Sequence, residues 1–414
     1  MARRRILLLN QYFWPDRAAT AQLLADLAED LAASPAGGDE VDWEVTALAG
    51  RATYAPGRPG PLPARETWNG VAIRRVACTN FGRGSKLGRL ADYATFFLSA
   101  ALAVLTGPRQ DVAVCLSTPP LVAALGLLAR LRGARFVYKV EDLYPDLAVA
   151  LGALRSDSFV AGALRRLSRF LLSRADAAVA LDEAMAASLR ERGARRVEVI
   201  PNWADGEALY PDPAKGERFR SEHGLEKQHF VVLYSGNLGL AHRFDAVADA
   251  FRGLAVSPVQ VVWLIVGDGP RLPEVRRQVT GLSAVRFLGY QPRERLQDLY
   301  NAADVHLVTL RDEVAGLLVP SKYAAALAAG KPVLVVGGSG TDLHAEVADR
   351  QVGWACPHDP AAVAATLRQA AASHPEQVRT LGRNARQLFE EKYSRELARR
   401  SWTRLLSEVS SPHV

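Results

Sequence analysis

A glycine-rich segment follows an apolar run in the second half of the chain. The run Val231-Val-Leu-Tyr leads into Ser235-Gly-Asn-Leu-Gly239, and a segment of helical period begins a few residues later. Glycines at such a point let a diphosphate approach backbone N–H groups near a helix N-terminus, where the helix dipole favours anions. The alternative is a tight strand-to-helix turn that needs glycine only for its backbone angles.

A lysine stands at the start of a second small-residue helix. The loop that ends in Pro320 leads into Ser321 and Lys322, and Gly330 with Pro332 ends the helix. Lysine is rare here, because only seven of the 51 Lys and Arg residues are lysines. A cation beside a helix N-terminus is unfavourable unless an anion binds there, so Lys322 is a candidate phosphate ligand. A surface lysine in a loop is the alternative.

Short apolar runs alternate with longer stretches of helical period along almost the whole chain. This order is typical of βα units, and strands that are apolar throughout predict parallel sheets covered on both faces. We expect an α/β fold with two Rossmann-like domains, a ligand-binding cleft between them and a C-terminal helical tail. The predicted domains are residues 1–205 and 206–390, followed by a helix over 391–414 that returns to the first domain. Residues 206–228, rich in proline and glycine, are predicted as a linker region.

Further polar loops follow other predicted strands. In the second domain these are Gly267-Asp-Gly-Pro270 and Gly289-Tyr-Gln291, which share an edge with the glycine-rich segment. In the first domain the loops carry four carboxylates that are candidate acids or bases. A role as helix cap or turn residue is the alternative for each of them. The four are Asp16, Glu141, Asp142 and Asp146.

Composition excludes several classes of protein. An apolar content of 49% and a charged content of 23% are those of a globular chain. Three scattered cysteines do not form a disulfide framework or a zinc cluster. No D-x-D motif and no metal-spaced histidine pair occurs in the sequence, so we expect no metal. The four-residue apolar run after the N-terminal arginines is too short for a signal peptide, and we expect a cytoplasmic protein.

Taken together, these segments resemble the two-domain GT-B glycosyltransferases of family 4, over nearly the whole chain. Within the family they look most like the bacterial subgroup that builds exopolysaccharide or O-antigen repeat units. The matching segments are Leu9-Asn-Gln-Tyr-Phe-Trp-Pro-Asp16 with Thr20-Ala-Gln22, Glu141-Asp-Leu-Tyr-Pro-Asp146, Ile200-Pro-Asn-Trp-Ala-Asp205, Tyr234-Ser-Gly-Asn-Leu-Gly239, Gly267-Asp-Gly-Pro270 and Val319-Pro-Ser-Lys322 with Ala328-Ala-Gly-Lys-Pro-Val333.

The resemblance implies transfer of a hexosyl or N-acetylhexosaminyl group, with retention of configuration and without a metal or cofactor. The donor would be a nucleotide-diphospho-sugar, with a UDP-sugar expected, and the acceptor a soluble or polyprenyl-diphosphate-linked glycan. The implied catalytic residues are Lys322 and Arg243 on the leaving diphosphate and Asp142 beside the acceptor hydroxyl. The implied donor-binding residues are Ser235, Gly236, Asn237, Gly239, His242, Gly267, Asp268, Gly289, Tyr290, Gln291, Leu318, Val319, Pro320 and Ser321. The implied acceptor-binding residues are Gln11, Tyr12, Asp16 and Glu141.

The sequence departs from the family pattern at three places. The family's E-x7-E pair would fall at Leu317 and Ala325, where neither residue is a carboxylate, so the ribose-binding glutamate is missing. The lysine that often follows the glycine-rich loop is also missing, and His242 stands near its place.

Basic residues are concentrated in the first domain, where residues 51–174 carry 18 Lys and Arg against 7 Asp and Glu. We expect peripheral contact with the anionic inner face of the plasma membrane, and no nucleic acid partner. A GT-B sugar-nucleotide epimerase and a catalytically silent GT-B scaffold remain the alternatives. The basic residues that flank apolar stretches are Arg83, Lys86, Arg89, Arg165, Arg166, Arg169 and Arg174.

Overall fold

The computed structural model describes residues 3–33, 41–53, 61–82, 86–254 and 260–411. The chain divides into two compact units. Unit 1 comprises Met1–Pro201, Leu317–Val319 and Ala398–Val414, and unit 2 comprises Asn202–Gly316 and Pro320–Leu397. Unit 1 thus ends before the predicted boundary at 205, and its C-terminal part begins at Ala398 instead of 391. The sequence did not predict that unit 1 includes Leu317–Val319.

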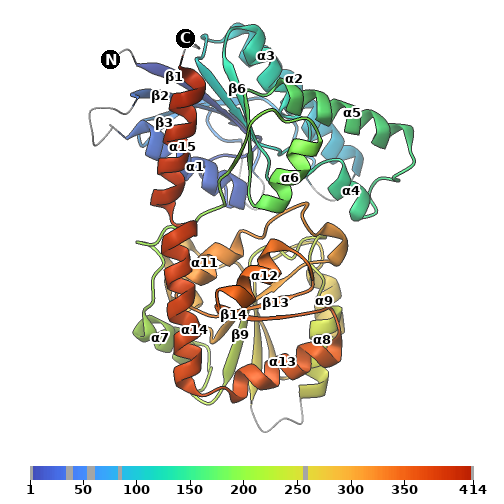
Figure 1. The fold of residues 1–414 in the computed structure, drawn as a ribbon, viewed down its shortest axis with the longest axis vertical. Coiled ribbons are helices and arrows are strands. Elements are labelled where there is room, and N and C mark those ends of the chain that lie inside the picture. Colours follow the sequence, from blue (N-terminus) through green and yellow to red (C-terminus); the bar gives the residue numbers. More distant parts are fainter. Residues whose placement is uncertain (1–2, 34–40, 54–60, 83–85, 255–259, 412–414) are drawn as a thin grey trace. The chain divides into compact units, whose positions relative to one another are not determined.

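Unit 1 is built on an eight-stranded sheet in the order β3-β4-β2-β1-β5-β6-β7-β8 (Figure 1). Every neighbouring pair is parallel except β3 with β4. The strands are β1 (Arg4–Leu9), β2 (Trp43–Gly50), β3 (Arg65–Trp68), β4 (Val71–Val76), β5 (Val112–Cys115), β6 (Arg135–Lys139), β7 (Ala177–Ala180) and β8 (Val197–Val199). The helices are α1 (Ala19–Ala32), α2 (Lys86–Thr106), α3 (Ala124–Leu131), α4 (Asp146–Ala150), α5 (Phe159–Arg174) and α6 (Glu183–Glu191).

Unit 2 is built on a six-stranded, fully parallel sheet in the order β11-β10-β9-β12-β13-β14. Its strands are β9 (Phe230–Ser235), β10 (Val261–Val266), β11 (Val285–Leu288), β12 (Val305–Thr309), β13 (Val333–Val336) and β14 (Gly353–Cys356). Its helices are α7 (Pro213–Glu222), α8 (Asp245–Leu254), α9 (Leu272–Gln278), α10 (Leu296–Ala302), α11 (Lys322–Ala328), α12 (Asp342–Asp349), α13 (Pro360–Ala372) and α14 (Pro375–Leu388). A π-helical turn over Phe389–Tyr393 follows α14, and α15 (Arg395–Ser410) begins in unit 2 and continues into unit 1. Short 3-10 turns span Arg293–Arg295 and Asp312–Val314.

The cores explain why both sheets form. In unit 1, apolar residues of α2, α3, α5 and α6 pack with residues of β1, β5, β6 and β7 into one buried cluster. In unit 2, α8, α9 and α13 pack in the same way on β9, β10, β12 and β13. Strands that are apolar along their whole length need cover on both faces. The predicted fold class, two Rossmann-like α/β sheets with a helical C-terminal tail, is confirmed.

The predicted linker over residues 206–228 is wrong, because it contains helix α7. Asp212 caps this helix by accepting a hydrogen bond from the Lys215 backbone N–H at 3.2 Å, and Pro213 occupies its first turn. Gly216 lets α7 pack tightly on α10, since a Cβ added there would lie 2.3 Å from the backbone oxygen of Asn301. Proline and glycine here shape a packed helix instead of a flexible connection.

Candidate functional site

Two glycine loops pack against each other at the carboxyl ends of β9 and β10 in unit 2. The Gly236 N–H donates to Val266 O at 2.9 Å, and the Leu238 N–H donates to Asp268 O at 2.8 Å. A Cβ added to Gly267 would lie 2.1 Å from Gly236 O, so side chains are excluded where the two backbones meet. The glycines therefore serve loop packing, which uses the N–H groups of Gly236 and Leu238.

Lys322 lies beside the first of these loops. A Cβ added to Gly236 would be 3.6 Å from Cε of Lys322. The ammonium group donates to Tyr234 Oη at 2.9 Å, lies 4.3 Å from the centre of the Tyr234 ring, and is 3.3 Å from Nε2 of His242. Among the described residues, no carboxylate forms an ion pair with Lys322. Its charge is thus available to an anion.

The burial of this cluster changes its titration. Burial lowers the pKa of Lys322 from 10.5 to about 7. Burial, with the nearby Lys322 charge second, lowers the pKa of His242 to about 3, so this imidazole is neutral. Because Nδ1 of His242 is 2.6 Å from Thr309 O, that nitrogen carries the proton and Nε2 accepts from Lys322. His242 therefore orients the lysine, and both of its ring nitrogens are engaged.

Arg243, the predicted second cation, forms a two-pronged ion pair with Asp245. Its Nε lies 2.8 Å from Oδ1 of Asp245, and its Nη2 lies 2.8 Å from Oδ2. The Asp245 carboxylate compensates the guanidinium charge. Arg243 thus differs from Lys322, whose hydrogen-bond partners are uncharged.

The other predicted donor-binding residues are spread over several loops. Ser235 ends β9, while Asn237 and Gly239 continue the first glycine loop. Asp268 accepts a hydrogen bond from the Gly269 N–H at 2.7 Å. At the end of β11, Gln291 donates to Gly289 O at 3.2 Å, and Tyr290 is exposed.

The residues just before Lys322 belong partly to unit 1 and partly to unit 2. Leu317–Val319 belongs to unit 1, where Leu317 O accepts from the Leu143 N–H at 2.9 Å and Leu318 bridges to Asp142. Pro320 and Ser321 belong to unit 2. Leu317, at the place of a family glutamate, packs on the unit 1 core, and Ala325 lies in α11.

A buried polar cluster follows β6 in unit 1. Oγ of Ser117 accepts hydrogen bonds from the backbone N–H groups of Glu141 at 3.0 Å and Asp142 at 3.1 Å. Glu141 also forms a buried ion pair with Lys139. Burial, with the Glu141 charge second, raises the pKa of Asp142 to about 7. Asp142 can therefore give or accept a proton near neutral pH.

The carboxylates elsewhere in unit 1 have structural partners. Asp16 accepts from the Ala18 N–H at 3.0 Å at the entry to α1. Asp146 is bound by both Arg165 and Arg192, and their hydrogen bonds lower its pKa although burial acts in the opposite direction. Asp16 thus makes the contact of a turn residue, and Asp146 is an ion-pair partner of two arginines.

Gln11 and Tyr12 follow β1. Gln11 is buried, its N–H donates to Thr118 O at 3.2 Å, and its side-chain Oε1 has no hydrogen-bond partner among the described residues. A buried amide oxygen without a partner is costly unless a ligand or water satisfies it. Gln11 therefore keeps its candidate role in acceptor binding.

Sequence reasoning missed the residues that orient the site. Tyr234 and Thr309 hold Lys322 and His242, and Ser117 holds the backbone of Asp142. Tyr234 lies in β9, where its polar side chain within an apolar run was the available signal, whereas Thr309 acts through its backbone carbonyl, which no residue type indicates. Ser117 lies two residues after the end of β5.

The two parallel sheets, with loops of this kind at the carboxyl ends of their strands, define a GT-B fold. One family model, described as a glycosyl transferase 4-like domain, matches residues 21–203. A second, described as glycosyl transferases group 1, matches residues 229–373. The chain belongs to the family 4 glycosyltransferases and is a nucleotide-sugar-dependent glycosyltransferase.

Curated relatives agree with this assignment, and a solved structure agrees with the fold. The probable glycosyltransferase WbjE of Pseudomonas aeruginosa is 30% identical over 297 residues, which cover 69% of this chain and 74% of WbjE. The putative colanic acid biosynthesis glycosyl transferase WcaI of Escherichia coli is 28% identical over 63% of this chain and 66% of its own length. The structure of Anabaena HepE with UDP-glucose matches with a TM-score of 0.71 at 18% identity, covering 98% of this chain and 100% of HepE.

Proposed function

We propose that the protein transfers a sugar from a UDP-sugar to a lipid-linked or soluble glycan during assembly of a bacterial surface polysaccharide, with retention and without a metal. The observation that carries the donor assignment is the Lys322 ammonium, held beside the glycine loop by uncharged partners. Two similar proteins support the UDP-sugar donor and the role in surface polysaccharide assembly. HepE was solved with UDP-glucose, and WcaI is a putative colanic acid biosynthesis enzyme.

The proposed chemistry is stabilisation of the leaving group. When the sugar–phosphate bond breaks, negative charge develops on the departing diphosphate, and donors aimed at that charge lower the barrier. Lys322 supplies a cation, and the glycine loop offers the backbone N–H groups of Asn237 and Gly239, which its hydrogen bonds to the neighbouring loop do not use. We assign deprotonation of the acceptor hydroxyl to Asp142 or to the departing phosphate.

The test measures products. The protein is incubated with UDP-glucose, UDP-N-acetylglucosamine or UDP-galactose and a polyprenyl-diphosphate-linked sugar, and the products are separated by mass spectrometry. We expect a glycosylated acceptor from one donor, with an α-linkage from an α-linked donor, and loss of product in Lys322→Met. A changed UDP-sugar formed without acceptor would instead identify an epimerase. No reaction and no donor binding would favour a silent scaffold.

Contact with an anionic membrane is the second part of the proposal. Helix α2 carries an exposed apolar stripe at helical spacing, and it is the one helix in the described part of the chain that is long and apolar enough to cross a membrane. Only 28% of its apolar window is buried. The stripe consists of Leu87, Leu90, Ala94, Leu98, Leu102 and Leu105.

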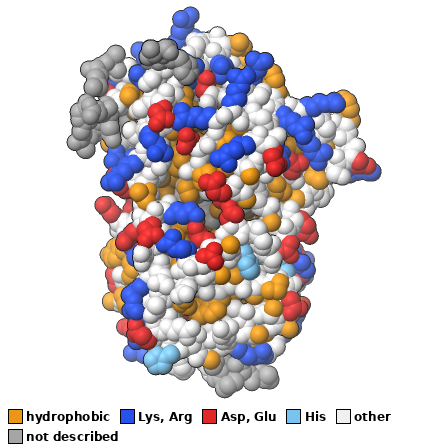
Figure 2. All heavy atoms as spheres, viewed as in Figure 1, with side chains coloured by type: hydrophobic (Ala, Val, Ile, Leu, Met, Phe, Trp, Pro, Cys, Tyr) orange, Lys and Arg blue, Asp and Glu red, His pale blue; other side chains and the backbone are white. Residues whose placement is uncertain are grey.

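Helix α5 also carries exposed apolar and cationic side chains. Phe159 is 86% exposed, and Phe170 is 47% exposed with Arg174 5.2 Å from its ring centre. On the face drawn in Figure 2, Lys and Arg side chains lie over α3 and α5 with hydrophobic side chains between them. Arg166 and Arg169 also lie exposed on α5, whereas Arg165 is bound by Asp146. Arg83 and the Lys86 side chain lie outside the described residues.

Such a surface suits a peripheral protein at an anionic bilayer. Flotation with phosphatidylglycerol vesicles tests it, using Arg166→Glu with Arg169→Glu and, separately, Leu98→Glu with Leu102→Glu. We expect both pairs to weaken vesicle binding without changing UDP-sugar affinity. Unchanged flotation in both variants would refute membrane contact and leave the donor assignment intact.

A further inference from the structure

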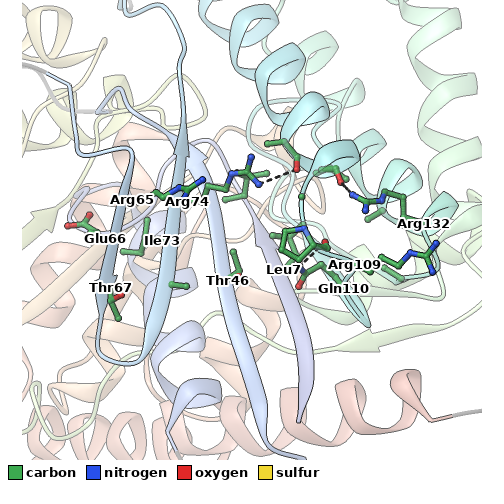
Figure 3. A pocket seen from close by; sticks show the side chains of 18 residues that line it. Leu7, Thr46, Arg65, Glu66, Thr67, Ile73, Arg74, Arg109, Gln110 and Arg132 are labelled. Carbon is green, nitrogen blue, oxygen red and sulfur yellow. Dashed lines mark hydrogen bonds between the residues drawn. The ribbon is translucent and has the colours of Figure 1, made fainter. Parts of the chain in front are cut away.

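Unit 1 contains a cavity of about 500 Å³ that the proposed reaction does not use. Its walls are the face of β1, β2, β3 and β4, the end of α2 with the following Gly107–Gln110, and the end of α3 (Figure 3). The segment after α2 leads to the amino end of β5, whereas Gln11 and Asp142 follow the carboxyl ends of their strands. The cavity is therefore a separate place in the fold. Its volume lies in the range of sites for small organic ligands.

The cavity combines an apolar floor with a cationic rim. Leu7, Leu48 and Val104 are among the buried side chains of the floor. Figure 3 shows Arg65 and Arg74 on one side and Arg109 and Arg132 on the other. The one acidic residue of the lining is Glu66, which forms an ion pair with the buried Arg75. Four guanidinium groups thus surround the cavity, and none of them forms an ion pair with a carboxylate among the described residues.

Two of these arginines have a structural role. Arg74 donates to Ala103 O at 3.4 Å, and Arg132 donates to Val104 O, so both satisfy carbonyls in the last turns of α2. Cations are favourable at a helix C-terminus, and this explains their presence. Arg65 and Arg109 remain. Within the described part of the chain neither has a side-chain hydrogen bond or ion pair, and both stand exposed at the rim.

We propose that this cavity binds an amphiphilic anion. Its phosphate-type head group would lie among the four arginines, and its apolar part would lie on the floor formed by Leu7, Leu48 and Val104. Guanidinium groups recognise phosphate oxygens through paired hydrogen bonds, and an apolar floor makes a purely ionic ligand less suitable than an amphiphile. The exposed Leu102 and Leu105 belong to the same turns of α2 as the lining residues Ala103 and Val104. A phospholipid head group and a soluble alkyl phosphate share the required chemistry.

The test is calorimetric titration of the full chain with octyl phosphate below its micellar concentration. We expect saturable one-to-one binding, with affinity at least tenfold higher than that of octyl glucoside, which has the same tail, or of inorganic phosphate. Dihexanoyl phosphatidylglycerol is then added as a competitor, and displacement would identify a lipid head group as the source. A failure of that lipid to compete would identify a soluble alkyl phosphate.

The decisive variant is Arg65→Gln with Arg109→Gln, because these side chains hold no structural contact. We expect it to weaken octyl phosphate binding at least tenfold and to leave UDP-glucose binding unchanged. Arg190→Gln with Arg195→Gln, at and after the end of α6, is the control, since it removes the same charge from unit 1 outside the cavity and away from the residues proposed for membrane contact. The proposal is overturned if octyl phosphate does not bind, if octyl glucoside or inorganic phosphate binds equally well, or if both double variants lose affinity alike.

Discussion

Binding of the donor is expected to take up a proton at Lys322. Burial lowers the pKa of this lysine to about 7 in the free protein. A diphosphate beside the ammonium favours its charged form, so the pKa rises in the complex. Above pH 7 the protein must therefore bind a proton together with the donor, and the affinity falls up to tenfold for each further pH unit.

The size of the change in affinity follows from the fraction of free protein in which Lys322 is charged. At pH 8.5, about 1.5 units above the pKa of Lys322, roughly one free protein molecule in thirty carries a charged lysine. The Kd for UDP-glucose should then be about 30-fold higher than at pH 6, which corresponds to ~2 kcal/mol of binding free energy. The diphosphate diester of the donor keeps its charge over this range, so the change reports the protein.

The assay is calorimetric titration of UDP-glucose between pH 6 and 8.5, without acceptor, in buffers of different ionisation enthalpy. We expect close to one proton taken up per site at pH 8.5. Lys322→Arg should give an affinity that does not change with pH, because a guanidinium stays charged. Lys331→Arg is the matched control. Burial also lowers the pKa of that lysine, to about 8, and this variant should keep the wild-type pH dependence.

Either of two results would refute proton uptake at Lys322 on donor binding. A Kd that stays constant from pH 6 to 8.5 in the wild type would mean that Lys322 does not change protonation when the donor binds. A pH dependence that persists unchanged in Lys322→Arg would assign the proton to another group.

Three further predictions concern stability and rate. Lys322→Met should raise the melting temperature at pH 6, because a buried lysine with a lowered pKa opposes folding when it must carry its charge. This gain should shrink as the pH rises from 7 towards 10.5, where the lysine is neutral in both the folded and the unfolded chain. An equal change of melting temperature at pH 6 and at pH 10 would contradict the assigned burial effect. Asp142→Asn should lower kcat about 10²-fold or more and remove the rise in rate around pH 7, because a carboxylate with a pKa of about 7 becomes a base as the pH rises through that value. An unchanged pH–rate profile would assign deprotonation to the departing phosphate. Gly216→Ala should destabilise unit 2 by about 1–3 kcal/mol, because the added Cβ would clash with Asn301. Gly253→Ala in α8 should be neutral or stabilising, because a Cβ there meets no atom within 4 Å. Thermal unfolding of the two variants measures the difference.

Buried parallel strands were the most predictable part of the fold. Val261–Val266 and Val333–Val336 are continuous apolar runs that are buried along their whole length, which is the pattern from which the sequence predicted parallel strands. Strand β3, which contains both charged and apolar residues, was not predicted from the sequence. Strand β3 pairs with β4 across Asn69-Gly70, whose φ angles of 44° and 80° are those of a tight hairpin turn, and Asn-Gly is a strong signal for such a turn.

The candidate site was predictable as a set of loops but not as a set of contacts. The glycine loops and Lys322 all belong to unit 2. The alternation of strands and helices along the sequence was enough to predict this placement. Whether a cation is free or paired depends on neighbours that only the folded chain supplies. Arg243 has a carboxylate two residues away, whereas Lys322 contacts Tyr234 and His242, about eighty residues earlier in the sequence.

The most direct test of the central claim is a crystal structure of the protein with UDP-glucose. We predict a diphosphate oxygen within hydrogen-bond distance of Nζ of Lys322, and a second within hydrogen-bond distance of the backbone N–H of Asn237 or Gly239 in the glycine loop. A bound UDP-glucose whose diphosphate contacts neither Lys322 nor this loop would contradict the assignment of the donor site.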